Sequence, residues 1–359
     1  LQQLDGTLRA FTFPDSLQKY QYLTASGIAT GNFKILTLDQ FSIAVDDAIN
    51  AKVNGTIRNI NRPDDLSYDL LFAEANFNTL QLPIPAVDKV DIAALGQVNY
   101  VGKLSGDKDS IRVDGKLESA LGNAEAKIVL GIKDGIDNLA YKGDLSLSQF
   151  DLGTLLKDES LGKITLNTTV NGRGTTLQKG NTNFTGFIKD FQYRGYTYNL
   201  IKVDAHVEEG QIDGVIDIDD PNALLQYDGT IFLDKELSTF DFSVNIDTIN
   251  LNTLNLYPEE ISLSGKLESQ FSLPLPERDP QIIIVKDLNL SNLTQNFYED
   301  SIVITALRKV DSTFLEIDSD IMQLHMDGIY QVADLPASTN DLVKKYIDTD
   351  TIIAHPDIT

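Results

Sequence analysis

The stretch IKVDAHVE, residues 201–208, alternates apolar side chains with polar or charged ones at every step. A second stretch, FDFSVNID at residues 240–247, has the same pattern, and a third runs from residue 261 to residue 273. Successive side chains of a β-strand point to opposite faces, so this period places the apolar residues on one face. The pattern predicts antiparallel strands in a sheet that is covered on one side only.

The same alternation extends through most of the 359 residues, whereas patterns with the 3.6-residue period of a helix are few and short. The sequence therefore predicts an all-β fold. A glycine two positions before an apolar residue recurs along the strands, and strand glycines commonly mark bulges, so we expect a sheet that bends at repeated positions. These glycines are Gly6, Gly55, Gly115, Gly143, Gly214, Gly229 and Gly265.

One short phrase occurs three times, most clearly as NLNTL at residues 250–254. The other copies are NFNTL at residues 76–80 and DLGTL at residues 151–155, so the copies start 75 and 99 residues apart. A recurring unit indicates a stacked array rather than a compact catalytic domain. We expect residues 1–359 to form one continuous array that is an excerpt of a longer chain.

The apolar face of such a sheet must be hidden by something. A sandwich would use a second sheet, a solenoid its successive coils, and a curled sheet its own other half or a ligand. Long, monotonous strands without tryptophan or intervening helices favour the curled sheet, an elongated β-taco or repeating β-groove with an apolar interior. At about 10 to 13 residues per strand and turn, the chain would hold roughly 28 to 35 strands.

Plain core packing and a ligand-filled groove both remain open as the meaning of this apolar face. The residues predicted to line the interior are Ile201, Val203, Ala205, Val207, Phe240, Phe242, Val244, Ile246, Ile261, Leu263, Leu267 and Phe271.

Helical segments are predicted at three places. Residues near 15–25 follow a proline and a polar cap and end before Gly27, and residues 339–347 carry an apolar stripe behind a serine or threonine cap. The leucines between residues 152 and 161 predict one helical turn after the second repeat phrase.

The charge balance limits the possible partners. The chain has 53 acidic and 29 basic residues and a net charge of −24, which disfavours nucleic acid. The absence of cysteine excludes disulfides and thiolate sites. No stretch approaches the roughly 18 consecutive apolar residues of a membrane span.

The chain offers no chemistry that points to an enzyme. His206, His325 and His355 are far apart and belong to no metal-ligand or nucleophile motif. The acidic run from Asp213 to Asp220 lacks the loop spacing of a calcium site, so we predict that Asp213, Asp217 and Asp219 form a solvated stripe. We predict no catalytic residue, no metal and no cofactor. A solenoid that cleaves carbohydrate would need paired acids in a cleft, for which the sequence gives no sign.

Three passages together resemble the TamB and AsmA-like envelope proteins, within the wider group of bridge-like lipid transfer proteins. Residues 150–174 have a cadence of FDLGTLL, LGKITL and VNGRG that is similar to a TamB repeat. Residues 203–254, which end in INLNTL, and residues 328–347, which begin GIYQVADLP, also resemble TamB passages. The likeness covers most of the chain, although the unequal spacing of the repeat phrases departs from a strict repeat.

This resemblance implies a taco-shaped β-groove in the periplasm that carries phospholipid acyl chains between the inner and outer membranes. It also implies an inner-membrane anchor in a segment outside these residues and an outer-membrane barrel partner similar to TamA or BamA. An alternative implied by the same family is a scaffold or chaperone of the translocation and assembly module, which serves the insertion of outer-membrane proteins.

Overall fold

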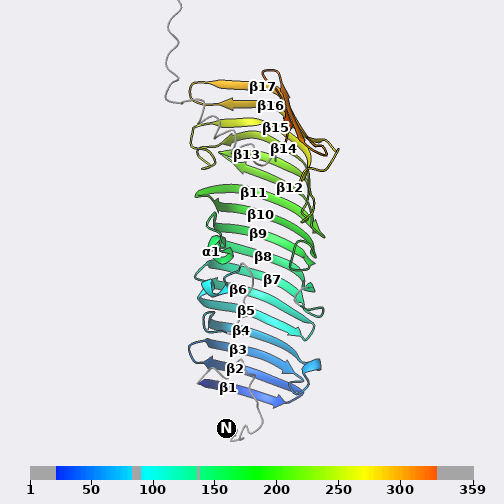
Figure 1. The fold of residues 1–359 in the computed structure, drawn as a ribbon. Coiled ribbons are helices and arrows are strands. Elements are labelled where there is room, and N and C mark those ends of the chain that lie inside the picture. The colour runs from blue at the N-terminus through cyan, green and yellow to red at the C-terminus, as the bar shows by residue number, and fades with distance from the viewer. Residues whose placement is uncertain (1–21, 83–89, 136–137, 330–359) are drawn as a thin grey trace, which may run out of the picture. The chain divides into compact units, whose positions relative to one another are not determined.

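The computed structural model describes residues 22–82, 90–135 and 138–329. These residues form nineteen strands and one short α-helix, and the strands make a single antiparallel sheet that is not closed on itself (Figure 1). Strands that follow one another along the chain are neighbours in the sheet. The predicted all-β class with an antiparallel sheet is confirmed.

The strands are β1 (Leu23–Asn32), β2 (Ile35–Val45), β3 (Ile49–Arg58), β4 (Ser67–Asn78), β5 (Gln97–Asp107), β6 (Ser110–Ser119), β7 (Gly122–Gly131), β8 (Ala140–Asp151), β9 (Leu161–Arg173), β10 (Asn181–Tyr193), β11 (Tyr196–Glu208), β12 (Gln211–Asp220), β13 (Ala223–Phe232), β14 (Ser238–Asn250), β15 (Ser262–Leu273), β16 (Gln281–Ser291), β17 (Asn296–Arg308), β18 (Thr313–Ser319) and β19 (Gln323–Gly328). The α-helix is α1 (Leu152–Leu156), and two 3₁₀ turns are η2 (Pro63–Asp65) and η3 (Ile92–Leu95). The described strands are fewer than expected because most contain ten to thirteen residues before any connection is counted.

The three helical predictions have different outcomes. The turn predicted between 152 and 161 is confirmed by α1, which Asp151 caps by accepting a hydrogen bond from the Thr154 backbone N–H. The helix predicted near 15–25 is wrong in its described part, because Leu23 to Ala25 belong to β1 and pair with β2. The ladder satisfies their backbone groups, so tertiary pairing overrides the local signal. The helix predicted at 339–347 lies outside the described residues.

The chain divides into two compact units, and each is described by itself. Unit 1 comprises Leu1–Leu224 and Asn252–Pro258, and it contains β1 to β12. Unit 2 comprises Leu225–Leu251 and Glu259–Thr359, and it contains β14 to β19. The expectation of one continuous array over residues 1–359 stays a prediction.

Bulges keep the apolar side chains on one face. In β2 the register shifts between Leu38 and Phe41, and in β8 it shifts between Leu147 and Phe150. Residues separated by three positions point to opposite faces in a regular strand. Only an inserted residue therefore leaves Leu38 and Phe41, or Leu147 and Phe150, on the same face. Gln40 and Gln149 supply that residue, with φ of 46° and 49°.

The recurring strand glycines have two different structural roles. Gly55, Gly143 and Gly265 adopt positive φ angles of 144°, 149° and 149°. At Gly229, by contrast, an added Cβ would lie 2.3 Å from Phe242 Cβ, and at Gly115 it would lie 2.6 Å from the Tyr100 hydroxyl oxygen. These two glycines make room for an aromatic side chain of the adjacent strand, and the expectation of a sheet that bends at repeated positions stays a prediction. Gly6 lies outside the described residues.

Candidate functional site

The candidate site of unit 1 is the apolar face of its sheet. Cross-strand register aligns the apolar residues of neighbouring strands in rows that run across the strands. The strand ends of unit 1 lie along two sides of the unit, which we call its edges and identify by the connections between strands that they hold. The closed edge holds the connections after β2, β4, β6, β8, β10 and β12, together with Asn252–Pro258, which Asn255 joins to Arg194. The open edge holds the connections after β1, β3, β5, β7, β9 and β11.

The row beside the closed edge is deeply covered. Val98 is 0% exposed and pairs with Phe77, which in turn pairs with Ile49. Further along the sheet, Phe150 pairs with Ile164, and both are buried. Within β1 to β12, all buried apolar residues lie in the two rows nearest the closed edge, except Leu38 and Val53.

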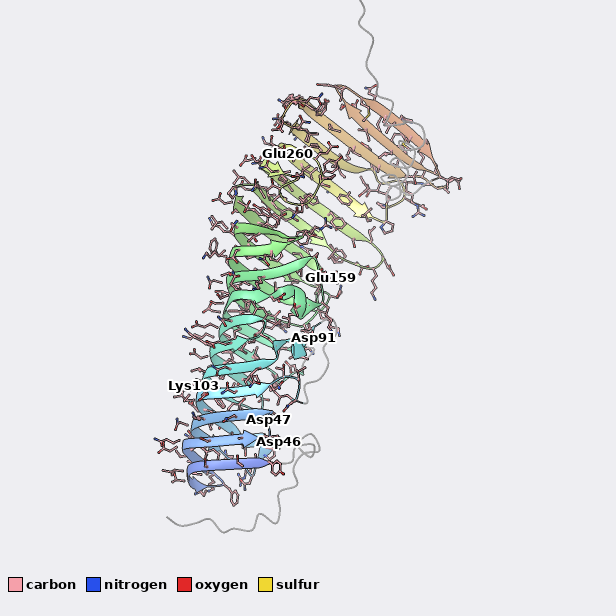
Figure 2. All side chains as sticks on the ribbon, turned by 90° about the vertical axis from the view of Figure 1, so that its left-hand side faces the viewer. Asp46, Asp47, Asp91, Lys103, Glu159 and Glu260 are labelled. Atoms are coloured by element: carbon pink, nitrogen blue, oxygen red, sulfur yellow. The ribbon has the colours of Figure 1, made fainter. Side chains whose placement is uncertain are left out.

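The cover of the closed edge comes from its own connections. α1 and η3 place Leu152, Leu155 and Leu95 against a cluster of Leu121, Phe150, Ile164 and Leu166. The two elements are joined, because the Asp91 backbone N–H donates to the Leu155 carbonyl at 2.7 Å and Lys157 lies 3.9 Å from the Asp91 carboxylate. Figure 2 shows Asp46, Asp47, Asp91 and Glu159 on one side of the view, and Lys103, on the polar face of β5, on the other.

All three repeat phrases lie at connections of the same kind, each following an even-numbered strand. After β4, the Thr79 hydroxyl donates to the carbonyls of Ala93 and Gly96 and so holds η3 in place. After β8, the phrase forms α1. The third phrase contributes Leu254 to unit 1, where it is 1% exposed, and Asn255 Nδ2 donates to the Arg194 carbonyl at 3.0 Å. In each copy, the repeat phrase therefore directs a connection back onto the protein.

A buried carboxylate at the closed edge was missed by the sequence analysis. Asp220 is 2% exposed and accepts hydrogen bonds from the Tyr196 hydroxyl at 2.6 Å, Asn199 Nδ2 at 2.8 Å, and the backbone N–H groups of Asn199 and Asn222 at 3.0 and 2.9 Å. Burial alone would raise the pKa of Asp220, but these hydrogen bonds outweigh it, and the pKa lies below its ordinary value. Burial and the Asp220 carboxylate raise the pKa of Tyr196.

A usable sequence signal for this network was the turn Asp220-Pro221-Asn222 directly after an alternating strand. The expected solvated stripe holds in part. Asp219 is exposed and Asp213 and Asp217 are half-buried, whereas Asp220 lies on the other face. Among the described residues no three histidine or acidic side chains are grouped as metal ligands.

The row beside the open edge has no such cover. Every member is half-buried, and no residue of this row is buried. Its members are Leu36, Ile57, Tyr68, Gly106, Ile111, Leu130, Tyr141, Gly172, Thr182, Val207 and Ile212, each paired with the next. The apolar face of unit 1 is thus covered at one edge and accessible at the other.

Four of the predicted lining residues lie on this face, in β11. Ile201 pairs with Ile188 and Ile218 and is buried near the closed edge. Val203, Ala205 and Val207 follow toward the open edge, and all three are half-buried. The intervening residues Lys202 and Asp204 are exposed on the polar face, as the alternation predicts.

The remaining predicted residues belong to unit 2. Phe240 stacks on Phe271 with ring centroids 4.7 Å apart, and Val244 pairs with Leu267. Phe242 pairs with Ser269, whose hydroxyl is buried without a hydrogen-bond partner, and Ile246 pairs with Gly265. A bulge then brings Ile249 opposite Leu263, and Ile261 lies just before β15. All eight predicted residues of unit 2 are half-buried, and their assignment as a lining stays a prediction.

The polar face of unit 1 carries one hollow, about 770 Å³ in volume, over β8 to β12. Phe187 and Val215 line it together with charged side chains such as Asp144, Lys202 and Asp217. Within this open, mixed lining the Thr169 hydroxyl donates to the Asp144 carboxylate at 2.7 Å.

No described helix is long and apolar enough to cross a membrane. Comparison of this chain with known protein families, with characterised proteins and with solved structures gives no match.

Proposed function

We propose that this protein is a non-enzymatic carrier that holds phospholipid acyl chains on the apolar face of its sheet and conducts phospholipids between the inner and outer membranes across the periplasm. The supporting observation is the continuous row of half-buried residues from Leu36 to Ile212, of which none is fully buried. A monomeric protein rarely leaves so long an apolar surface accessible unless something binds there.

The energetics favour acyl chains as the occupant. Each CH₂ group removed from water contributes about 0.8 kcal/mol, so a chain laid along the rows gains several kcal/mol without any specific contact. The polar face, with exposed pairs such as Lys103 and Asp69 at 3.0 Å, stays in water. An inner-membrane anchor and an outer-membrane barrel of the TamA or BamA kind belong to the same proposal.

A substitution in β14 tests it. Val244→Asp places a charge on the apolar face between Phe242 and Ile246, whereas Ser243→Asp places the same charge one residue away on the exposed face. We expect Val244→Asp to reduce lipid bound to the purified protein, and lipid flux in the envelope, by about tenfold with β content unchanged. Ser243→Asp should leave both as in the parent. Equal lipid binding by the two variants would refute the proposal.

An assembly scaffold for outer-membrane proteins is the second candidate, and β1 favours it. All ten residues of β1 are exposed, none is charged or proline, and within the described residues it pairs only with β2. An exposed outer strand of this kind can pair with a strand from another polypeptide. Native mass spectrometry separates the candidates, since a carrier retains lipid and a scaffold is isolated without it.

A further inference from the structure

This inference rests on the proposed function and concerns how a lipid lies on unit 1. The first observation is the difference in burial between the edges. At the closed edge α1 and η3 pack on the buried residues of the apolar rows, and at the open edge the row stays accessible. A headgroup needs water or polar partners, so only the open edge can accommodate one.

The second observation is the charge of the two edges. In the described connections of the closed edge, five acidic residues accompany two basic ones, Lys157 and Arg194. The described connections of the open edge carry five acidic and five basic residues. In a protein of net charge −24, a phosphate meets less repulsion at this edge than at the closed edge.

The basic residues of the open edge are also available. Lys34, Arg62, Lys133 and Lys179 are exposed and form no ion pair with any described residue, and Lys108 has only a distant one, 4.0 Å from Asp64. Carboxylates lie in the same connections, among them Asp109 and Asp134. An edge that carries both charges matches a headgroup that itself carries a phosphate and an ammonium group.

The third observation is the chemistry of the rows. The row beside the open edge includes the hydroxyls of Tyr68, Tyr141 and Thr182, and the Tyr141 and Thr182 hydroxyl oxygens are 2.6 Å apart. In the row beside the closed edge, the paired series Val45–Ile49–Phe77–Val98 and Phe150–Ile164–Phe191 are entirely apolar. Tyrosine suits a boundary where one side is apolar and the other is wet.

We propose that unit 1 binds zwitterionic phospholipids in one orientation, with headgroups along the open edge and acyl chains pointing to the closed edge. Lys34, Arg62, Lys133 and Lys179 contact the phosphates. The neighbouring carboxylates contact the ammonium groups. Net anionic lipids bind less well because the chain as a whole repels them.

The test uses residues 1–359 and vesicles that contain phosphatidylethanolamine, phosphatidylglycerol and a minor fraction of diacylglycerol, all with the same acyl chains. After incubation the protein is re-isolated and its lipid is measured by mass spectrometry. Relative to its share in the vesicles, we expect phosphatidylethanolamine to be enriched in the bound lipid about fivefold over each of the other two lipids. A few exposed ion pairs supply a factor of this size.

Two variants with the same change in net charge locate the effect. Lys34→Glu, Arg62→Glu, Lys133→Glu and Lys179→Glu together should abolish the enrichment while diacylglycerol uptake stays unchanged. The control replaces Lys127, Lys142, Lys189 and Lys202 by glutamate, all exposed on the polar face, and should keep the enrichment. Circular dichroism verifies that both variants are folded.

The outcomes separate the two proposals. If the parent takes up no lipid, diacylglycerol included, the proposed function fails and this inference with it. If lipid binds without headgroup preference, or if both variants behave alike, only the orientation is refuted. Displacement of phosphatidylethanolamine by inorganic phosphate alone would also refute it, because the edge would then be a site for free phosphate.

Discussion

The two edges of unit 1 are built from the same alternating strands but end differently. At the closed edge, connections fold inward and bury Val98, Phe150 and Leu254, while at the open edge the corresponding row remains half-buried. The strands determine which side chains share a face, and the connections determine how much of that face meets water. Stability and ligand binding are therefore expected to depend on opposite ends of the same strands.

The largest effect is expected at the closed edge. Phe150→Ala removes a buried ring from the cluster under α1 and should lower the free energy of unfolding by about 3–4 kcal/mol. Urea denaturation followed by circular dichroism measures it. Phe187→Ala, on the polar face of β10 and 38% exposed, is the control and should cost less than about 1 kcal/mol. Equal losses would contradict the comparison of the edges.

A backbone substitution between the edges comes next. Gly143→Ala places a methyl group 2.0 Å from the Lys127 carbonyl oxygen at φ 149°, and should cost about 2–3 kcal/mol through clash and strain. Gly135 has φ 81° but no atom within 4 Å of an added Cβ, so Gly135→Ala isolates the strain and should cost about 1 kcal/mol. Similar unfolding midpoints for the two variants would show that the close strand approach is unimportant.

The buried carboxylate of Asp220 makes the stability of the closed edge depend on pH. Asp220→Asn replaces an acceptor of four hydrogen bonds and should cost about 2 kcal/mol at neutral pH, whereas Asp219→Asn, exposed and adjacent, should change little. Because folding lowers the pKa of Asp220, its stabilisation is fully present above the unfolded pKa of about 3.9 and is lost as the pH falls through the folded value. Urea midpoints of parent and variant should converge at low pH. A constant difference from neutral to acid would mean that the carboxylate charge does not contribute.

The smallest effect is expected at the open edge. Leu130→Ala removes a half-buried side chain and should cost about 1 kcal/mol, against about 2–3 kcal/mol for Leu166→Ala at the closed edge. Lipid bound to the purified protein should fall in Leu130→Ala despite its near-parental stability. If Leu130→Ala destabilised as much as Leu166→Ala, the open edge would be part of the core.

Alternation by itself determined the fold class and the face on which each predicted lining residue lies. The pattern from Ile201 to Glu208 fixes which side chains point together, since the strand period is two, and the structure has these residues where the pattern places them. The helical turn at α1 was also readable, because its capping aspartate and leucines are local.

The tertiary structure decided what depends on partners distant in sequence. Leu23 to Ala25 became a strand because β2 was there to pair with them, and Gln40 and Gln149 became bulge residues because two neighbouring strands had to keep one apolar face. Asp220 became buried because Tyr196 and Asn199 converge on it from β11. The difference between a closed and an open edge likewise arises from connections packing on strands, a long-range event that no local period in the sequence encodes.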